Sequence, residues 1–268
     1  MTKHITLSAC ATLLLVAHGT HAAQIFSSSF TNGEGFSEST TINGVGGFAS
    51  QAGVISVDVA GGGEVQYVPN NPTNPNSANF LRAIAPSFDS LGVSSFNPGD
   101  VIEVTTQIRA VGGNTPGFDA NIFHFGITDD SDLGTTAPDV GANLGAGNNG
   151  LWDIADQSGG GKTDTAFMVD NTTTRLLVTT ITKSATPGDF DVVNTLDGES
   201  FVFAVTNLDV YNAATADIFP TFRGQGQLNV GGIAVESFAV DFTPIPEPTA
   251  VGTLALGLLA VGARRRRS

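Results

Sequence analysis

The chain has 268 residues, of which 25 are acidic and 11 are basic, and its formal net charge is −14. Between residues 24 and 245 the imbalance is larger, with 24 acidic and six basic residues and a formal charge of −18. The six basic residues are scattered singly, so this segment has no cationic patch of the kind that binds phosphate backbones. The composition argues against nucleic acid and anionic lipid as partners.

The N-terminus has the pattern of a secretory signal. Lys3 and His4 precede an apolar run from Ile5 to Ala17, and small residues follow that run. This order is typical of a signal peptide that signal peptidase removes. We predict a signal helix within residues 1–23 and cleavage at Ala22 or Ala23, so that the mature chain starts near residue 24.

The single cysteine of the chain lies inside this signal. The segment Leu7-Ser8-Ala9-Cys10 resembles a bacterial lipobox, but the apolar run continues past Cys10, whereas a lipobox cysteine ends it. Removal of the signal therefore leaves a mature chain without disulfides or thiolate ligands. About 220 residues can bury a sufficient core without such cross-links.

Residues 24–243 are predicted to form one all-β domain. Short β-branched or aromatic segments recur between clusters of Gly, Asn, Asp and Pro, and nothing reads as a long helix. From Val101 to Ala110 apolar and polar residues alternate, which places one strand face against a core. This pattern favours an antiparallel β-sandwich of the jelly-roll type. The other expected strands are 24–30, 53–59, 64–68, 80–85, 121–128, 176–182, 201–205 and 233–242, and the expected loops include 61–63, 69–75 and 141–150.

The run Phe125-Gly126-Ile127-Thr128-Asp129, followed by an acidic loop, resembles concanavalin-like lectin and glucanase domains. The resemblance implies the jelly-roll fold.

The acidic loop itself is a candidate calcium site. Asp129, Asp130 and Asp132, together with Asp139, place carboxylates at the end of a strand, and Ca²⁺ collects such oxygens from loops. The spacing does not match an EF-hand, so an acidic turn without metal is the alternative. No cofactor other than Ca²⁺ is implied.

Trp152 is the candidate for contact with a glycan. It lies between a glycine-rich loop and two acidic residues, Asp153 and Asp156, which suits the rim of a sugar site. The alternative is a tryptophan packed in the core.

The sequence lacks a convincing catalytic constellation. Once the signal is removed His124 is the sole histidine, and it lies in mid-strand with no nucleophile elbow nearby. Sandwich glucanases use a pair of carboxylates. The strand of alternating acids expected for them is absent here, and Asp189 and Asp191 fall in a predicted turn. We therefore predict a non-catalytic body.

The C-terminal segment, residues 244–268, carries the most specific motif. Pro246-Glu247-Pro248 is followed by an apolar run over residues 250–263 and then by Arg264, Arg265, Arg266 and Arg267. As a helix the apolar run measures about 21 Å, short of a bilayer core of about 30 Å, and the arginines favour the cytoplasmic side. This order resembles the PEP-CTERM sorting signal of bacterial envelope proteins. The resemblance implies an exosortase-type protease, cleavage near Pro-Glu-Pro, and transient membrane anchoring by a hydrophobic helix.

These patterns predict an exported cell-envelope or extracellular-matrix protein with a non-catalytic sandwich body. Its expected partners are signal peptidase, an exosortase-type sorting protease, and exopolysaccharide or other glycans, and its expected final location is the cell surface or the medium. Two alternatives stay open, a calcium-assisted carbohydrate-binding module and a glycan hydrolase.

Overall fold

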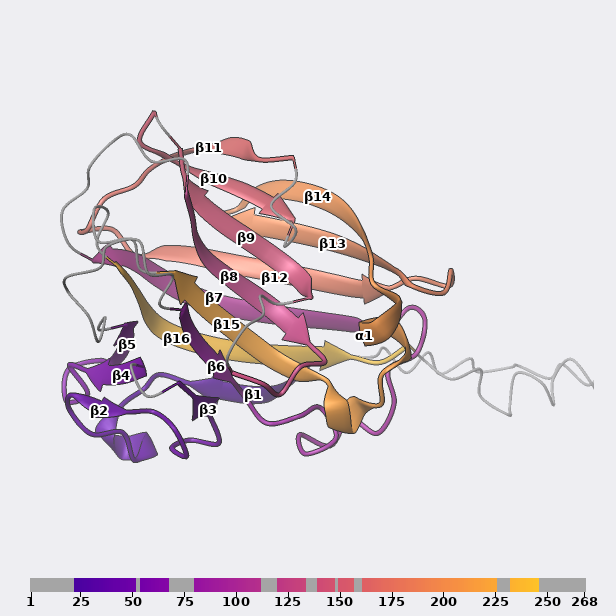
Figure 1. Cartoon of the computed structure of the whole chain (residues 1–268), viewed down its shortest axis with the longest axis horizontal. Helices are drawn as coiled ribbons and strands as arrows, with labels where there is room; N and C mark the ends of the chain where they lie inside the picture. The colour runs from indigo at the N-terminus through magenta and orange to yellow at the C-terminus, as the bar shows by residue number, and fades with distance from the viewer. Residues whose placement is uncertain are drawn as a thin grey trace, which may run out of the picture. The chain divides into compact units, whose positions relative to one another are not determined.

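The computed structural model describes residues 22–51, 54–67, 80–111, 120–133, 139–147, 149–156, 161–225 and 232–245 (Figure 1). The residues from Ala22 to Ile245 form one compact unit. The predicted signal helix and the predicted hydrophobic helix lie outside the described residues, as do Pro246-Glu247-Pro248 and Arg264 to Arg267. Within the part of the chain that the structure describes, no helix has the length and apolar character needed to cross a membrane.

The described residues form two antiparallel sheets. The nine-stranded sheet has the order β14-β13-β12-β7-β16-β5-β4-β2, with β1 also paired to β16, and the seven-stranded sheet has the order β11-β10-β9-β8-β15-β6-β3. The strands are β1 (Ala23–Ser28), β2 (Thr40–Thr41), β3 (Ala49–Ser50), β4 (Val54–Val57), β5 (Glu64–Tyr67), β6 (Phe80–Ile84), β7 (Val101–Val111), β8 (Ala120–Thr128), β9 (Val140–Ala146), β10 (Leu151–Asp156), β11 (Thr163–Met168), β12 (Arg175–Lys183), β13 (Asp189–Leu196), β14 (Glu199–Thr206), β15 (Phe219–Gln225) and β16 (Gly232–Thr243). One short α-helix, α1 (Leu208–Asn212), and two 3-10 turns, Asn32–Glu34 and Thr215–Asp217, complete the described elements.

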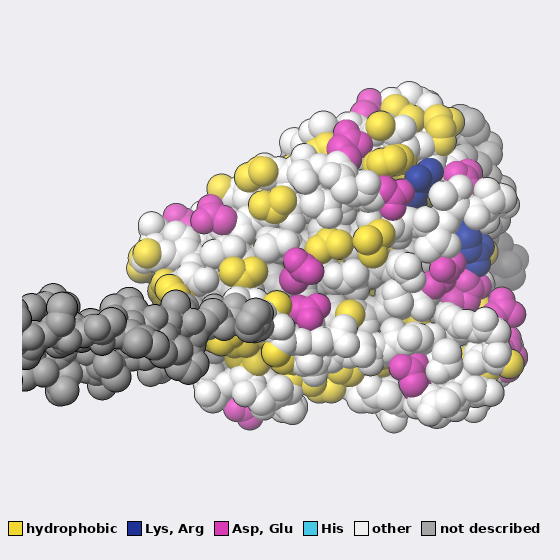
Figure 2. All heavy atoms as spheres, turned by 180° about the vertical axis from the view of Figure 1, so that it is seen from behind, with side chains coloured by type: hydrophobic (Ala, Val, Ile, Leu, Met, Phe, Trp, Pro, Cys, Tyr) yellow, Lys and Arg dark blue, Asp and Glu magenta, His cyan; other side chains and the backbone are white. Residues whose placement is uncertain are grey.

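The two sheets pack face to face as a sandwich, which confirms the predicted all-β jelly-roll class. Strand β7 shows the cause, because Ile102, Val104 and Ile108 are buried on one face while Gln107 is exposed on the other. The period of two in the sequence is the period of the pleat. Seen from behind, acidic side chains and apolar side chains are scattered over the surface (Figure 2).

Phenylalanine rings fill the space between the sheets. Phe222 on β15 of the seven-stranded sheet contacts Phe238 on β16 of the nine-stranded sheet, with ring centroids 5.3 Å apart. Phe48 lies 6.0 Å from Phe222 and 6.2 Å from Phe238, so a single aromatic cluster bridges both sheets. All three rings are at most 2% exposed. Burial of aromatic side chains of this size dominates core energetics.

Two segments that the sequence analysis assigned to loops or turns are strands. Residues 140–146 form β9, although 141–150 was predicted as a loop, and Asp189 and Asp191 lie in β13 rather than in a turn. The glycine content of β9 has a packing cause. Gly141 pairs with Gly126 of β8, and a Cβ on Gly141 would lie 2.1 Å from the Phe125 carbonyl oxygen. The two strands approach too closely there for any side chain.

The two ends of the compact unit leave from neighbouring strands. Ala23 at the start of β1 is the cross-strand partner of Phe242 near the end of β16. The segment that enters the body and the segment that leaves it are therefore adjacent.

The close approach of β8 and β9 makes Gly126 sensitive to substitution. We expect Gly126→Ala to lower the free energy of unfolding by roughly 2 to 4 kcal/mol, because the added Cβ would lie 2.1 Å from the Val140 carbonyl oxygen. Gly61→Ala is the control, since the nearest atom to a Cβ there is 3.8 Å away, and it should change stability by less than about 0.5 kcal/mol. Urea unfolding measures both, and equal losses would contradict the close approach.

Candidate functional site

The outer face of the seven-stranded sheet carries a row of polar residues. Arg82 on β6, Arg223 on β15, His124 on β8 and Asn143 on β9 are successive cross-strand partners. Each of the four has a strand neighbour in the hydrophobic core, so these four lie on the opposite face. The core neighbours are Ala83, Phe222, Phe123, Phe125, Ala142 and Leu144. Their exposed fractions are 1%, 8%, 6% and 1% in that order. We call this buried set the polar row.

Burial and the two arginines set the charges of the polar row. Burial, and after it the charge of Arg223, lowers the pKa of His124 from 6.5 to about 4, so its imidazole is neutral at pH 7. Burial, and after it the charge of Arg82, lowers the pKa of Arg223 to about 10, which still leaves the guanidinium protonated. The row therefore combines two cations with two neutral hydrogen-bonding groups inside a strongly acidic body.

Side-chain atoms of His124 and Asn143 in the polar row have no hydrogen-bond partner. The Nδ1 atom of His124 has no partner, and neither do the Nδ2 and Oδ1 atoms of Asn143. Most buried polar atoms in native proteins are paired, because an unpaired one costs about 1 to 3 kcal/mol. The amide of Asn143 can therefore take both a donor and an acceptor from ordered water or from a polar ligand.

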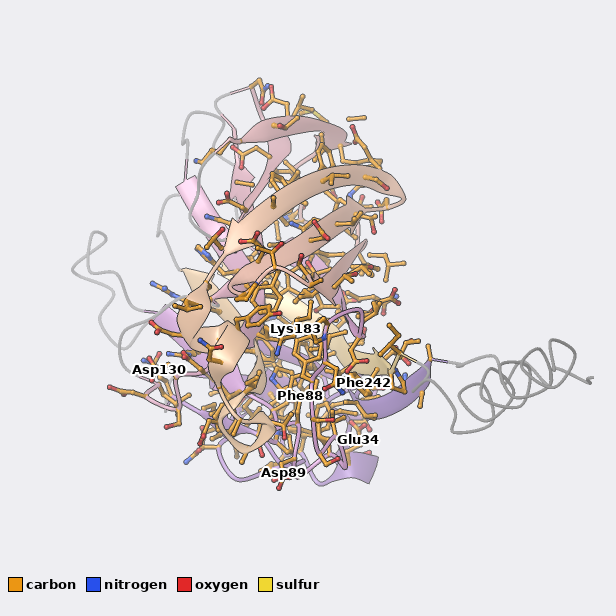
Figure 3. The ribbon with its side chains drawn as sticks, turned by 90° about the vertical axis from the view of Figure 1, so that its right-hand side faces the viewer. Glu34, Phe88, Asp89, Asp130, Lys183 and Phe242 are labelled. Carbon is orange, nitrogen blue, oxygen red and sulfur yellow. The ribbon has the colours of Figure 1, made fainter. Side chains whose placement is uncertain are left out.

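Arg82 also organises the acidic loop that follows β8. Its Nη1 atom donates to the Asp132 carbonyl at 2.6 Å and pairs with the Asp130 carboxylate at 3.4 Å, and its Nη2 atom donates to the Asp130 carbonyl at 2.8 Å. Figure 3 marks Asp130 in this loop. The guanidinium thus places a positive charge beside the oxygens of this loop.

The four aspartates predicted as calcium ligands are divided between two places. Asp130 and Asp132 engage Arg82, whereas Asp139 accepts hydrogen bonds from the Thr128 hydroxyl at 2.7 Å and from the Asp129 amide at 3.2 Å. Burial, and after it the neighbouring Asp139 carboxylate, raises the pKa of Asp129. Ca²⁺ takes about six to eight oxygens. Among the described residues no three His, Cys, Asp or Glu side chains gather as metal ligands. Calcium binding at this loop stays a prediction.

Trp152 is a core residue, which corrects its prediction as a glycan contact. Its side chain on β10 is 1% exposed and belongs to the hydrophobic cluster. Strand alternation turns Trp152 inward and Asp153 to the outer face. A ring in this position cannot stack on a sugar, so the acidic neighbours and the glycine-rich loop were a misleading signal.

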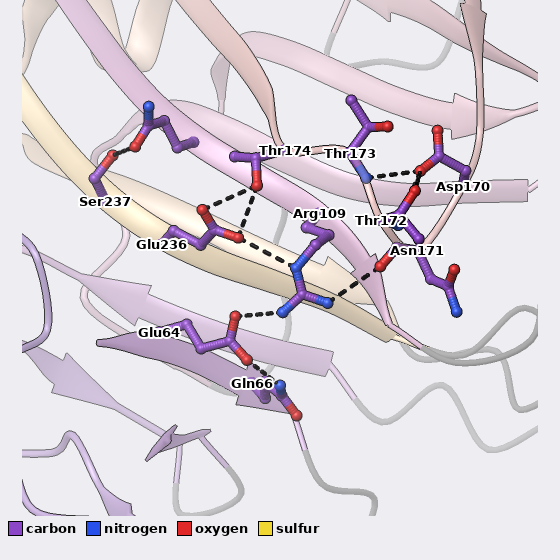
Figure 4. A network of polar contacts seen from close by, with 11 residues as sticks. Glu64, Gln66, Arg109, Asp170, Asn171, Thr172, Thr173, Thr174, Glu236 and Ser237 are labelled. Atoms are coloured by element: carbon purple, nitrogen blue, oxygen red, sulfur yellow. Dashed lines mark hydrogen bonds and ion pairs between the residues drawn. The ribbon is translucent and has the colours of Figure 1, made fainter. Parts of the chain in front are cut away.

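A second polar cluster lies on the nine-stranded sheet (Figure 4). Arg109 on β7 pairs with Glu64 at 2.6 Å and with Glu236 at 3.2 Å, where a β-bulge in β16 interrupts the register beside Glu236. Both carboxylates line a pocket of about 490 Å³ with Glu38, Asp58 and residues 60–63. Burial opposes the charge of Arg109, but hydrogen bonds and charge from Glu64 and Glu236 outweigh it and raise the pKa of Arg109.

Glu64 and Glu236 share one partner. Both carboxylates bind the guanidinium of Arg109. The cluster therefore links the side chains of three neighbouring strands, β5, β7 and β16.

The structure describes only part of the predicted processing sites. Ala22 and Ala23 are both exposed, and β1 begins at Ala23. Cleavage at either residue would leave β1 essentially intact. The Pro-Glu-Pro element and the four terminal arginines lie outside the described residues.

Residues 244–267 match the family described as the PEP-CTERM protein-sorting motif. The chain carries a PEP-CTERM sorting motif. The motif indicates an exported protein with a membrane-directed sorting signal that an exosortase recognises. No curated protein matches the sequence closely enough to count as a relative.

Solved structures share the fold at low sequence identity. Lectin I from Ulex europaeus, in complex with the methyl glycoside of α-L-fucose, has a TM-score of 0.51 and 10% identity over 83% of this chain and 98% of that chain. An endo-1,3-β-glucanase from Streptomyces sioyaensis has a TM-score of 0.49 and 12% identity over 84% and 97% of the two chains. The VIP36 exoplasmic/lumenal domain in its Ca²⁺/Man3GlcNAc-bound form has a TM-score of 0.46 and 13% identity over 86% and 93%. The body thus shares the jelly-roll fold of this lectin from Ulex europaeus.

The polar row was missed by the sequence analysis. His124 was noted there, but Arg82, Arg223 and Asn143 were not connected to it. The available signal was a polar residue flanked by core residues in each of several strands, as in Phe123-His124-Phe125. That signal does not tell which strands are neighbours.

The depressed pKa of His124 predicts a dependence of stability on pH. Between pH 6.5 and about 4 the unfolded chain binds a proton that the folded chain does not, so stability falls as the pH falls through this window. The loss attributable to His124 is on the order of 3 kcal/mol. In urea unfolding at pH 7 and pH 4.5, His124→Gln should lose less stability than the wild type. Equal losses would place the pKa of His124 near its ordinary value.

Proposed function

We propose that the protein is an exported cell-envelope or extracellular-matrix protein that an exosortase-type protease processes near Pro-Glu-Pro. The sorting motif at residues 244–267 supports this proposal, and the signal-like N-terminus agrees with it. The body then reaches the cell surface or the medium, where disulfide-free sandwiches of this size are stable without cross-links.

We infer that the sandwich body binds a glycan through the polar row. The observation that carries this inference is Asn143, whose amide is 1% exposed and has no hydrogen-bond partner at either end. An amide of this kind can donate to one sugar hydroxyl and accept from another. The unpaired Nδ1 atom of His124, the cross-strand neighbour of Asn143, adds one more site.

The proposed role is binding without catalysis. His124 is neutral and buried, and the carboxylates of Glu64 and Glu236 are both engaged by Arg109. Because the polar row is buried, a sugar would reach it through a local opening of the outer face. Such binding would retain the processed body in an exopolysaccharide layer.

Asn143→Leu separates binding from folding. The substitution keeps a similar shape and removes an unpaired amide, so stability should stay the same or rise. Retention on immobilised exopolysaccharide should fall by roughly tenfold or more if a sugar completes the hydrogen bonds of Asn143. The melting temperature and the retained fraction measure the two effects.

Asn194→Leu is the matched control. Asn194 is equally buried, but its amide is paired with Thr179 and with the Gly141 carbonyl. Its loss should lower stability and leave the retention of the folded fraction unchanged. Unchanged retention by Asn143→Leu would contradict glycan binding at the polar row, and release of reducing sugar from the polysaccharide would contradict a non-catalytic body.

Intact-mass analysis of protein recovered from cells and medium tests the export and sorting proposal. A mature form that starts near Gln24 and ends near Pro246 is the expected result. A form that retains Arg264 to Arg267 in every fraction would contradict processing by a sorting protease.

A further inference from the structure

The chain leaves the body beside a rigid turn. Asn97-Pro98-Gly99-Asp100 forms a β-turn in which the Asp100 amide donates to the Asn97 carbonyl at 3.0 Å. Gly99 has a φ of 92°, and proline precedes it, which is the residue pattern of a type II turn. The turn leads directly into β7, the strand that pairs with β16 up to Thr243. The turn and the end of β16 are therefore neighbours.

The Asp100 side chain holds the last residue of the body. Asp100 is 1% exposed, and its two carboxylate oxygens accept hydrogen bonds from two backbone amides. One is the amide of Asn97 at 2.6 Å, and the other is the amide of Ile245 at 2.5 Å. Charged acceptors make stronger hydrogen bonds to amides than neutral ones do. The Ile245 side chain also lies over Gly99, since a Cβ there would be 2.7 Å from Ile245 Cδ1.

The neighbouring strand end holds the turn in place. The Gly99 amide donates to the Lys183 carbonyl at 2.7 Å, and the Lys183 amide donates to the Asp100 carbonyl at 3.2 Å. The Lys183 ammonium donates to the Phe96 carbonyl at 2.7 Å and to the Tyr211 carbonyl at 2.9 Å, and it lies 4.2 Å from the centre of the Tyr211 ring. We call Asp100, Gly99 and Ile245 the exit clamp.

The exit clamp coincides with the boundary of the sorting motif. The motif match begins at residue 244, whereas the compact unit extends to Ile245. The first two residues of the motif are therefore part of the folded body. Proteases cut backbone that can leave its folded contacts, so residues held by such contacts are poor substrates.

We propose that Asp100 is a positioning residue that fixes the upstream limit of sorting. It holds Ile245 in the body, so the sorting protease receives a chain that starts at Pro246 and has no spacer before it. This inference rests on the proposed processing by an exosortase-type protease. It adds that the mature C-terminus is Pro246 or a later residue, and that the corner formed by the exit clamp lies beside the protease during cleavage.

Two measurements on the full chain test the exit clamp. The first is hydrogen exchange of the Ile245 amide by NMR, with Val240 of β16 as the reference for an intact fold. In the wild type the Ile245 amide should be protected. Asp100→Ala should speed its exchange by roughly tenfold or more while Val240 stays protected.

The second measurement is the C-terminal mass of protein matured in cells that contain the sorting protease. Wild-type chains should end at Pro246 or later, and Asp100→Ala should add chains that end upstream of Pro246.

Asp191→Ala is the control, because Asp191 is exposed on β13 and its loss changes the charge equally. It should match the wild type in both measurements.

If Asp100→Ala does not fold, a second variant tests the exit clamp. Ile245→Pro removes the backbone N–H that donates to Asp100 and leaves the turn intact, and it should give the same upstream shift of the C-terminus. A rapidly exchanging Ile245 amide in the wild type, or wild-type chains that end at or before Ile245, would overturn the proposal. If no variant is cleaved at all, the sorting proposal fails, while the exchange of Ile245 still decides whether the exit clamp exists.

Discussion

The contact between the rings of Phe222 and Phe238, with centroids 5.3 Å apart, joins the two sheets, and the rest of the body depends on it. Side chains on a strand alternate between faces, so placing Phe222 in the core places Arg223 on the outer face. A slip of one residue in β15 would exchange the two and bury a guanidinium among phenylalanines. The register that places the phenylalanines in the core therefore also places the polar row on the outer face.

The polar row concentrates cations in a body whose formal charge between residues 24 and 245 is −18. Arg82 donates hydrogen bonds to the Asp130 and Asp132 carbonyls in the acidic loop after β8. His124 stays neutral beside Arg223, because burial and the nearby positive charge both oppose a second proton. The unpaired amide of Asn143 is then the part of the row that a ligand would complete.

The exit clamp and the start of β1 adjoin the same sheet, since Asp100 precedes β7, Ile245 follows β16, and β1 and β7 both pair with β16. The two ends of the body that are expected to be processed thus depend on one strand. A hydrogen bond from the Ile245 amide to a buried carboxylate is a small interaction, but its position at the last residue of the compact unit gives it influence over where the chain becomes available to an enzyme.

The sequence by itself determined the sorting motif, the signal-like N-terminus and the β-sandwich class. The first two are linear patterns, and the third follows from an alternation that is local to each strand, as in β7. The sequence did not determine that residues 140–146 form a strand, because the cause is the approach of Gly141 to Gly126 in another part of the chain. Nor did it determine the burial of Trp152, the pairing of Asp130 with Arg82, the polar row or the exit clamp. Each of these joins residues that are distant in the chain, and only the register between strands brings such residues together.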